Sequence, residues 1–346
     1  MSNQVTRRTI LGGLTGAAMY PLVGQAADIP SELYEAAKKD GEVNWYVSAF
    51  STADAERIKT AFAARYPGIT INIQRQTAGT LFQRVSEELR ANSPLCNVLS
   101  TTGTSSFFAL RDAGQLVEYR PRNLDTMLDA YREPKIENYL QMVSATVMAI
   151  GYNTKGVPAA EAPKSWLDLT QPKWKGKLVV CHPAFQGSSV SWCLVMQKLY
   201  GNSFFTKLKD VQPQMARSLV DTSTLVASGE RQVGISYVGG ILETASKGNP
   251  VGLVYPTDGI VIADSYTTIL KGRKNLNASK LLNEFLLSPE VSAITVKTFG
   301  ETLHKGVAPA ASSKPLSEVK YHRLPAEELV KGERQIKEMW RDTFGI

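Results

Sequence analysis

The 346-residue sequence has few of the residues that build metal centres, disulfide frameworks and nucleophilic active sites. It contains three cysteines and three histidines, with no CxxC pair and no histidine spacing typical of a metal site. Three cysteines cannot all pair with one another, and Cys181 and Cys193 lie in apolar runs typical of small core residues. No Gly-x-Ser-x-Gly elbow and no catalytic Cys/His arrangement is present. These absences argue against an enzyme, and we expect neither a cofactor nor a metal.

The sequence also lacks a concentrated block of charge. The formal net charge is +7, and removing residues 1–26 takes away Arg7 and Arg8 but no acid, which leaves 7 − 2 = +5. No stripe of basic and aromatic residues suggests nucleic acid as a partner. A mild positive excess is compatible with attraction of a small anion. A hydrophobic content of 43% and a charged content of 21% describe a globular protein, and the length predicts two lobes.

The N-terminus has the pattern of an export signal. Thr6-Arg7-Arg8-Thr9-Ile10-Leu11 leads into an uncharged run over residues 10–23, and small residues follow at 24–26. The run is too short and too rich in glycine to span a bilayer, so we predict a signal peptide over residues 1–26. The paired arginines are similar to a twin-arginine (Tat) signal, with Thr for the usual Ser and Ile for the usual Phe. Sec export remains the alternative, and both routes predict a periplasmic protein.

The centre of the chain contains a strand, a Gly/Ser turn and a buried helix in succession. Residues 178–181 form a short apolar run that Pro183 ends, and a Gly187-Ser-Ser189 turn precedes an apolar helix over residues 190–200. Free N–H groups in the first turn of such a helix provide a seat for an anion. An ordinary capped helix is the alternative interpretation of this segment alone.

The same unit recurs three times near the N-terminus. Strands over residues 43–47, 69–73 and 97–100 each lead through a hydroxyl-rich turn into a helix. Repeated units of this kind predict an α/β fold with a mainly parallel, helix-covered sheet. Ligands of such folds bind at the carboxyl ends of the strands.

The turns at these strand ends supply most of the candidate ligand-binding residues. Arg75 is the best candidate counter-charge, although a solvated arginine at a strand edge has the same pattern. Asp258 lies in a Thr-Asp-Gly sequence that is also typical of a plain turn. The full set of candidates is Ser48, Phe50, Ser51, Arg75, Thr77, Gly79, Thr80, Thr101, Thr102, Gly103, Gly187, Ser188, Ser189, Tyr237 and Asp258.

Several ordered segments resemble one known family, the periplasmic solute-binding proteins of ABC importers with the type II two-lobed architecture. The closest branch is that of iron(III), phosphonate and sugar-phosphate binders. The segments are Trp174-Lys-Gly-Lys177, the turn from His182-Pro183 to Gly187-Ser188, Leu199-Tyr-Gly201, Val233-Gly-Ile-Ser-Tyr237, Pro256-Thr-Asp-Gly259, Leu270-Lys-Gly-Arg-Lys-Asn275 and Phe285-Leu-Leu-Ser-Pro-Glu290.

The resemblance implies a ligand cleft between two lobes and a membrane-embedded ABC permease as partner. We expect lobe 1 to comprise residues 27–142 and 262–310, and lobe 2 to comprise residues 143–261 and 311–346. Strands near residues 143–152 and 260–270 would form the hinge between the lobes. We expect a monomer that binds one small molecule.

We predict the class of ligand from hydrogen-bond donors, because the sequence has no cluster of cationic residues. Hydroxyl and N–H groups at the predicted turns favour a small organic anion that bears phosphate, phosphonate or carboxylate. Ferric iron is the alternative, but iron(III) binders of this family usually carry two adjacent tyrosines where this chain has Tyr237-Val238. Tyr46 and Tyr255 could in principle converge on Tyr237, although tyrosines in apolar strands are more often packing residues. An exported periplasmic enzyme is a remote alternative.

Overall fold

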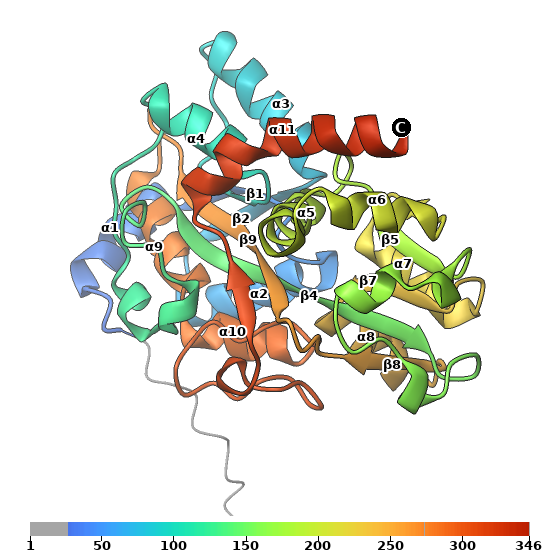
Figure 1. The fold of residues 1–346 in the computed structure, drawn as a ribbon. Coiled ribbons are helices and arrows are strands. Elements are labelled where there is room, and N and C mark those ends of the chain that lie inside the picture. Colours follow the sequence, from blue (N-terminus) through green and yellow to red (C-terminus); the bar gives the residue numbers. More distant parts are fainter. Residues whose placement is uncertain (1–26, 273, 346) are drawn as a thin grey trace, which may run out of the picture.

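The protein is described by a computed structural model that covers residues 27–272 and 274–345. The predicted signal peptide, residues 1–26, lies outside the described residues. Figure 1 shows two lobes joined by the long strands β4 and β9. The α/β, two-lobed architecture predicted from the sequence is confirmed.

The N-terminal part of lobe 1 consists of the three predicted strand–turn–helix units, preceded by one helix. Its pairs β1–β2 and β1–β3 are parallel, with Val47 opposite both Arg75 and Ser100. Pro67-Gly68 ends the second helix, and Gly41 ends the first in a left-handed conformation (φ 76°). The elements are α1 Ser31–Asp40, β1 Glu42–Val47, α2 Thr52–Arg65, β2 Thr70–Arg75, α3 Ala78–Arg90, β3 Val98–Thr101 and α4 Thr104–Asp112.

Two long antiparallel strands connect the lobes. β4 (Gln141–Asn153) and β9 (Ile260–Ile269) pair from Gln141↔Thr267 to Met148↔Val261, with a bulge between Met142 and Ser144. All of β9 is buried, because the strand runs through the middle of the sheet. The strand order β2-β1-β3-β9-β4-β7-β5-β6 therefore continues from one lobe into the other, while β10 pairs with β9 and β8 with β4.

Lobe 2 repeats the strand–turn–helix arrangement around β5, with β6 and β7 parallel to it on its two sides. The sequence analysis missed β6 and α7, although Ser218 and Asp221 form a capping box that marks the start of α7. The elements are β5 Leu178–Cys181, α5 Gly187–Tyr200, α6 Ser203–Asp210, β6 Gln214–Ala216, α7 Leu219–Ser228, β7 Val233–Tyr237, α8 Val238–Ser246 and β8 Val251–Val254.

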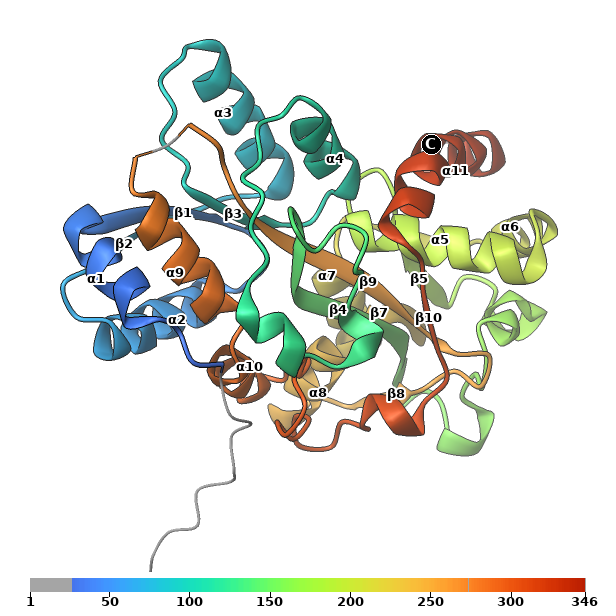
Figure 2. The same ribbon diagram turned by 90° about the vertical axis from the view of Figure 1, so that its left-hand side faces the viewer.

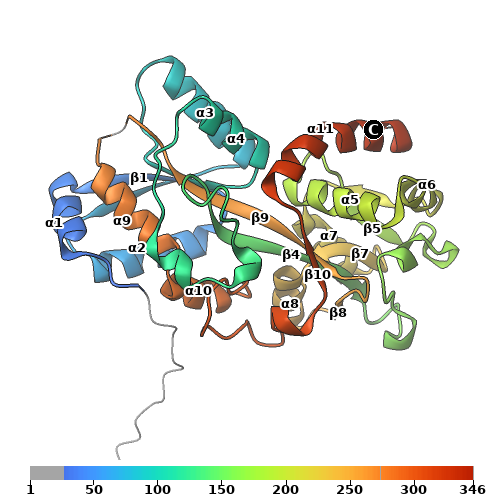
Figure 3. The same cartoon turned by 60° about the vertical axis from the view of Figure 1, so that its left-hand side comes forward.

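The C-terminal part of the chain packs on both lobes. Helix α9 (Leu276–Leu286) covers β1 and packs against α1, and α10 (Pro289–Val296) lies against α2. After β10 (Tyr321–Arg323), helix α11 (Ala326–Phe344) contacts α4 of lobe 1 and α5 of lobe 2, as Figures 2 and 3 show. The short 3-10 helices are η1 Arg122–Thr126, η2 Asp129–Tyr131, η3 Ala159–Glu161, η4 Leu167–Thr170, η5 Pro172–Trp174 and η6 Leu316–Glu318.

The buried apolar side chains of the described residues form two large clusters and two smaller ones. One large cluster is built around Trp45, Phe62 and Phe285, and the other around Trp166 and Trp192. Cys181 and Cys193 belong to the second cluster and form no disulfide, which confirms their interpretation as core residues. Among the described residues, no helix is long and apolar enough to cross a membrane.

Candidate functional site

A cavity of about 610 Å³ lies between the lobes beside β4. On the lobe 1 side it is lined by the loop after β1 (residues 48–51), by Arg75 at the end of β2, and by the segment that follows α10 (residues 298–304). On the lobe 2 side it is lined by Tyr237 and by the first turn of α8. The cavity therefore has the position expected for a ligand cleft, at the carboxyl ends of parallel strands from both lobes.

Hydrogen bonds to β3 fix the loop that carries Ser48 and Phe50. The backbone N–H groups of Ser48 and Ala49 donate to the Ser100 carbonyl at 2.9 and 3.2 Å. The Ser48 hydroxyl is also hydrogen-bonded to the hydroxyl of Thr101. The loop is thus held against the end of β3, and Ser48, Phe50 and Ser51 line the cavity.

Charged groups of the cleft gather on lobe 1. Asp54 is nearly buried, pairs with Arg57 at 2.9 Å, and accepts hydrogen bonds from the hydroxyls of Ser51 (2.7 Å) and Thr298 (2.9 Å). Arg75 donates from Nε to the carbonyl of Phe50 at 3.0 Å, and it forms no ion pair with any described residue. The terminal nitrogens of Arg75 are therefore the unopposed cationic donors of the cavity wall.

The lobe 2 wall is formed by Tyr237 and the start of α8. Burial raises the pKa of the Tyr237 phenol, and the charge of Glu243 raises it further, so the hydroxyl stays protonated at neutral pH and can donate a hydrogen bond. Gly239 lies directly against lobe 1, because a Cβ atom at this position would be 2.3 Å from the carbonyl oxygen of Phe299. The lobes are therefore in close contact at this point.

A narrow recess adjoins the cavity where the start of α4 meets the start of α5. Thr102 and Gly103 line it from lobe 1, Gly187 and Ser188 line it from lobe 2, and Thr146 lines both the recess and the main cavity. A Cβ atom at Gly187 would lie 3.9 Å from the hydroxyl of Thr102, so the lobes also approach each other here.

The backbone at this recess suits an anion. Gly103 has a φ of 99°, a conformation that side chains with a Cβ rarely adopt, and it precedes the first turn of α4. Within the described part of the chain, the backbone N–H groups of Gly187 and Ser188 have no hydrogen-bond acceptor. Helix α5 therefore presents free donors at its N-terminus to the space between the lobes.

The turn after β2, which contains three of the predicted ligand-binding residues, lies outside the cavity and the recess. Thr77, Gly79 and Thr80 line neither the cavity nor the recess. The Thr77 hydroxyl caps α3 by accepting from the Thr80 N–H at 3.4 Å, and the two threonine hydroxyls are 2.9 Å apart. β2 is the edge strand of the sheet, so only the long Arg75 side chain extends from its end to the cleft.

Three further predicted ligand-binding residues, Thr101, Ser189 and Asp258, do not line the main cavity or the recess. Thr101 is fully buried, and Ser189 is buried with its hydroxyl beside the Cys181 thiol. Asp258 accepts hydrogen bonds from the Trp166 N–H (2.8 Å) and from the Tyr200 hydroxyl, so it fastens a loop of lobe 2 and lines neither the cavity nor the recess. The plain-turn alternative for the Thr-Asp-Gly sequence is therefore the better one.

The sequence analysis missed the contribution of the segment after α10. Glu301 and His304 line the cavity, and burial raises the pKa of Glu301 to about 7. Burial also lowers the pKa of His304 to about 4, and its Nδ1 is 2.9 Å from the Thr126 hydroxyl. Nothing in the local sequence marks these residues, because only the packing of this segment against β4 brings them to the cleft.

The three tyrosines considered for ferric iron do not converge. The Tyr46 hydroxyl donates to Glu88 at 2.6 Å, and Tyr255 bonds the backbone N–H of Lys314 through its hydroxyl at 3.0 Å. Neither tyrosine lines the cavity that contains Tyr237. Within residues 27–272 and 274–345, no group of three or more His, Cys, Asp or Glu side chains could hold a metal ion.

Solved structures of periplasmic binding proteins share this fold. The periplasmic binding protein AfuA from Actinobacillus pleuropneumoniae, with fructose-6-phosphate bound, superposes with a TM-score of 0.76 at 22% identity, covering 88% of this chain and 99% of that one. Iron-bound HitA from Pseudomonas aeruginosa superposes with a TM-score of 0.75 at 22% identity, covering 87% and 99%. At this identity, the likeness shows the fold alone.

Sequence comparison identifies the family. A spermidine/putrescine-binding periplasmic protein of Escherichia coli is 28% identical over 164 residues, which are 44% of this chain and 45% of that protein. Residues 93–329, more than half of the chain, match the family described as bacterial extracellular solute-binding protein. The chain belongs to this family of bacterial extracellular solute-binding proteins, and it has the fold of the periplasmic binding proteins of ABC importers.

Proposed function

We propose that this solute-binding protein captures a small organic anion that bears phosphate, phosphonate or carboxylate, and that it delivers the anion to a membrane-embedded ABC permease. Arg75 is the observation that carries the proposal. The charges of the other arginine and of the lobe 2 acid in the cleft are paired, Arg57 with Asp54 and Glu243 with Lys247 (2.7 Å). Arg75, in contrast, has no carboxylate partner among the described residues. Hydrogen bonds to a charged group contribute about 1.5–3 kcal/mol each, so this guanidinium is a strong anchor.

Neutral donors of both lobes would complete the anion site. Ser48 and the Tyr237 hydroxyl line the cavity, and the free N–H groups at the start of α5 line the adjoining recess. A helix N-terminus contributes up to about 2 kcal/mol to a partly buried anion. Together these groups offset desolvation of a phosphate or carboxylate without a cluster of lysines.

Ferric iron is supported less well than an organic anion. A trivalent hard cation needs several anionic oxygen ligands, and the Tyr237 phenol has a raised pKa and no tyrosine beside it. We infer a binding role rather than catalysis, because AfuA and the E. coli relative are named as binding proteins.

The remaining parts of the proposal concern export, assembly and motion. The twin-arginine-like segment would direct the chain to the periplasm, where we expect a monomer without a nucleic-acid partner. Lobe 1 would comprise residues 27–142 and 262–310, and lobe 2 residues 143–261 and 311–346. The lobes would close around the ligand by bending of β4 and β9.

A thermal-shift screen of the mature chain tests the ligand class. Sugar phosphates, phosphonates, carboxylates, polyamines and ferric citrate would be compared in one plate. A ligand that binds the folded state stabilises it by about 4 kcal/mol at a thousandfold excess over Kd, so a true ligand gives a clear rise in Tm. We expect members of the anionic classes to raise Tm. A rise with polyamines or ferric citrate alone would contradict the proposal.

A further inference from the structure

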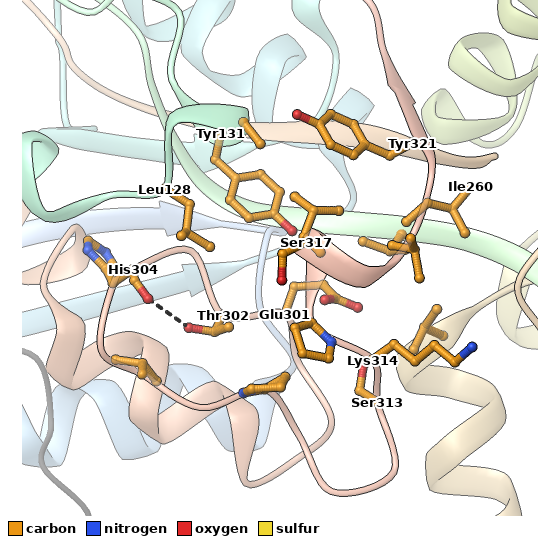
Figure 4. Close-up of a pocket in the computed structure, with 18 of the residues that line it drawn as sticks. Leu128, Tyr131, Ile260, Glu301, Thr302, His304, Ser313, Lys314, Ser317 and Tyr321 are labelled. Atoms are coloured by element: carbon orange, nitrogen blue, oxygen red, sulfur yellow. Dashed lines mark hydrogen bonds between the residues drawn. The ribbon is translucent and has the colours of Figure 1, made fainter.

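A second cavity, of about 320 Å³, lies next to the cleft and is drawn in Figure 4. Its walls come from the segment around η2, from the loop 301–309, and from residues 313–321 around η6. Leu128, Val147 and Ile260 contribute to an apolar part of the lining, alongside tyrosines and several charged or polar residues. Its volume lies within the range of about 300–1,000 Å³ that is typical of small-molecule sites.

Among the described residues that line this cavity, the acids are Asp129, which pairs with Lys305, and Glu301. The Glu301 carboxylate receives no hydrogen bond and forms no ion pair within the described part of the chain. In Figure 4 the Glu301 carboxyl group, the Tyr131 hydroxyl and the Ser317 side chain point toward one another. The charge of Glu301 raises the pKa of Tyr131, after the larger effect of burial, which is consistent with this proximity. Glu301 is partly buried and its carboxylate has no partner in the described part of the protein, so a ligand with a complementary charge would gain by pairing with it here.

The charged groups around the cavity do not neutralise Glu301. Lys305 pairs with Asp129 at 3.3 Å, and both side chains are exposed. The Lys314 ammonium group lies over the ring of Tyr255, 5.4 Å from its centroid. His304, the remaining basic residue of the lining, has a pKa lowered to about 4 by burial and is neutral at physiological pH.

We propose that this second cavity binds a small organic ammonium ion with a short aliphatic body. The ammonium group donates to Glu301 and to the Tyr131 hydroxyl oxygen, and the aliphatic body packs against the apolar wall. An organic anion would meet the Glu301 carboxylate in this cavity without a guanidinium to pair with, whereas the cleft offers Arg75. A bare metal ion does not fit, because one carboxylate supplies too few ligands.

The second site is separate from the proposed anion site, yet the two are neighbours. Glu301, His304 and Val147 line both cavities. Ser317 lines the second cavity and not the cleft, whereas Arg75 lines the cleft and not the second cavity. These two residues allow one site to be changed without the other.

Isothermal titration of the mature chain with butylammonium chloride tests the proposal. The comparison probes are n-butanol, which lacks the charge, and sodium butyrate, which reverses it. We expect butylammonium to bind at one site. We expect n-butanol to bind there at least about tenfold more weakly, and butyrate not to bind in this cavity. Equal binding of butylammonium and n-butanol, or no binding of butylammonium to the wild-type chain, would overturn the proposal.

Three variants locate the site. Glu301→Gln should weaken butylammonium binding by about tenfold or more, and Ser317→Phe should abolish it by filling the cavity. Arg75→Gln should leave it unchanged. Loss with Arg75→Gln, or full binding by Ser317→Phe, would place the ammonium in the cleft and overturn the proposal. If Glu301→Gln fails to fold, Ser317→Phe and the n-butanol comparison still decide the question. A failure of the anion screen leaves these outcomes unaffected.

Discussion

The two walls of the interlobe cleft differ in chemistry. Lobe 1 contributes the ionisable groups Arg57, Arg75, Asp54 and Glu301, whereas lobe 2 contributes Tyr237, Gly239 and the exposed Val220. The single charged residue of the lobe 2 wall of the main cavity, Glu243, is paired with Lys247. Under the proposed function, lobe 1 would attract and orient the anion, and lobe 2 would enclose it with neutral donors. Each prediction below changes one wall and uses the other, or a residue outside the cleft, as the reference.

The largest expected effect concerns the stability contributed by Glu301 of the lobe 1 wall. The pKa of Glu301 is about 7 in the folded protein, against an ordinary value of 4.5. Between these values the folded state holds a proton that the unfolded state has released, so stability falls as pH rises through this range. Relative to Glu301→Gln, the wild-type chain should therefore lose about 3 kcal/mol of unfolding free energy between about pH 4.5 and pH 8.

Urea unfolding of both proteins at the two pH values measures this loss. His304 remains in both proteins, so its own titration cancels in the difference. A difference between wild type and variant that is the same at the two pH values would show that Glu301 is ionised and well solvated in the folded protein.

The second prediction breaks the contact between the walls. In Gly239→Ala, the added Cβ atom would lie 2.3 Å from the Phe299 carbonyl oxygen, so the lobes must separate. Overpacking of this kind costs about 1–3 kcal/mol, and we expect anion affinity to fall by roughly tenfold or more. Small-angle scattering should show a larger radius of gyration than for the wild type. Gly79→Ala is the control, because a Cβ at Gly79 meets no atom within 4 Å. An unchanged radius with unchanged affinity would contradict the closed arrangement of the lobes.

A smaller effect is expected at the N-terminus of α5. Ser188→Leu places a bulky side chain in the recess beside Thr102, and we expect anion affinity to fall by about tenfold because the free N–H donors at the start of α5 are obstructed. Thr80→Leu is the matched control on lobe 1, because Thr80 lies outside both the recess and the cavity. Thermal shift with the best anion from the screen measures both variants. Equal losses in the two variants would mean that the turn after β2 also binds the ligand.

Local sequence signals predicted most of the elements. Apolar runs ended by Pro183, and helices ended by Gly41 and Gly201, are patterns that do not depend on tertiary structure. Helix α7 was missed because its sequence is rich in Ser and Thr, which are weak helix formers, and its only clear signal is the capping box. β6 has three residues and exists only through its pairing with β5.

The site was less predictable than the fold. A hydroxyl-rich turn has the same kind of sequence whether it only caps a helix, as at Thr77, or lines the cavity, as at Ser48. Only the position of the strand in the sheet separates the two cases, and strand order was not visible in the sequence. Glu301 and His304 reach the cleft through long-range packing, so no local pattern could have identified them.

The central claim, that Arg75 anchors an organic anion, is tested most directly by isothermal titration of the best anion from the screen against three proteins. These are the wild-type chain, Arg75→Gln and Arg75→Lys. Loss of charge-assisted hydrogen bonds of about 1.5–3 kcal/mol should weaken binding to Arg75→Gln by about 10- to 100-fold. Arg75→Lys keeps the charge and should retain part of the affinity. Arg90→Gln, on the far end of α3, serves as the control for loss of a positive charge outside the cleft. Equal affinity of Arg75→Gln and the wild-type chain would contradict the account.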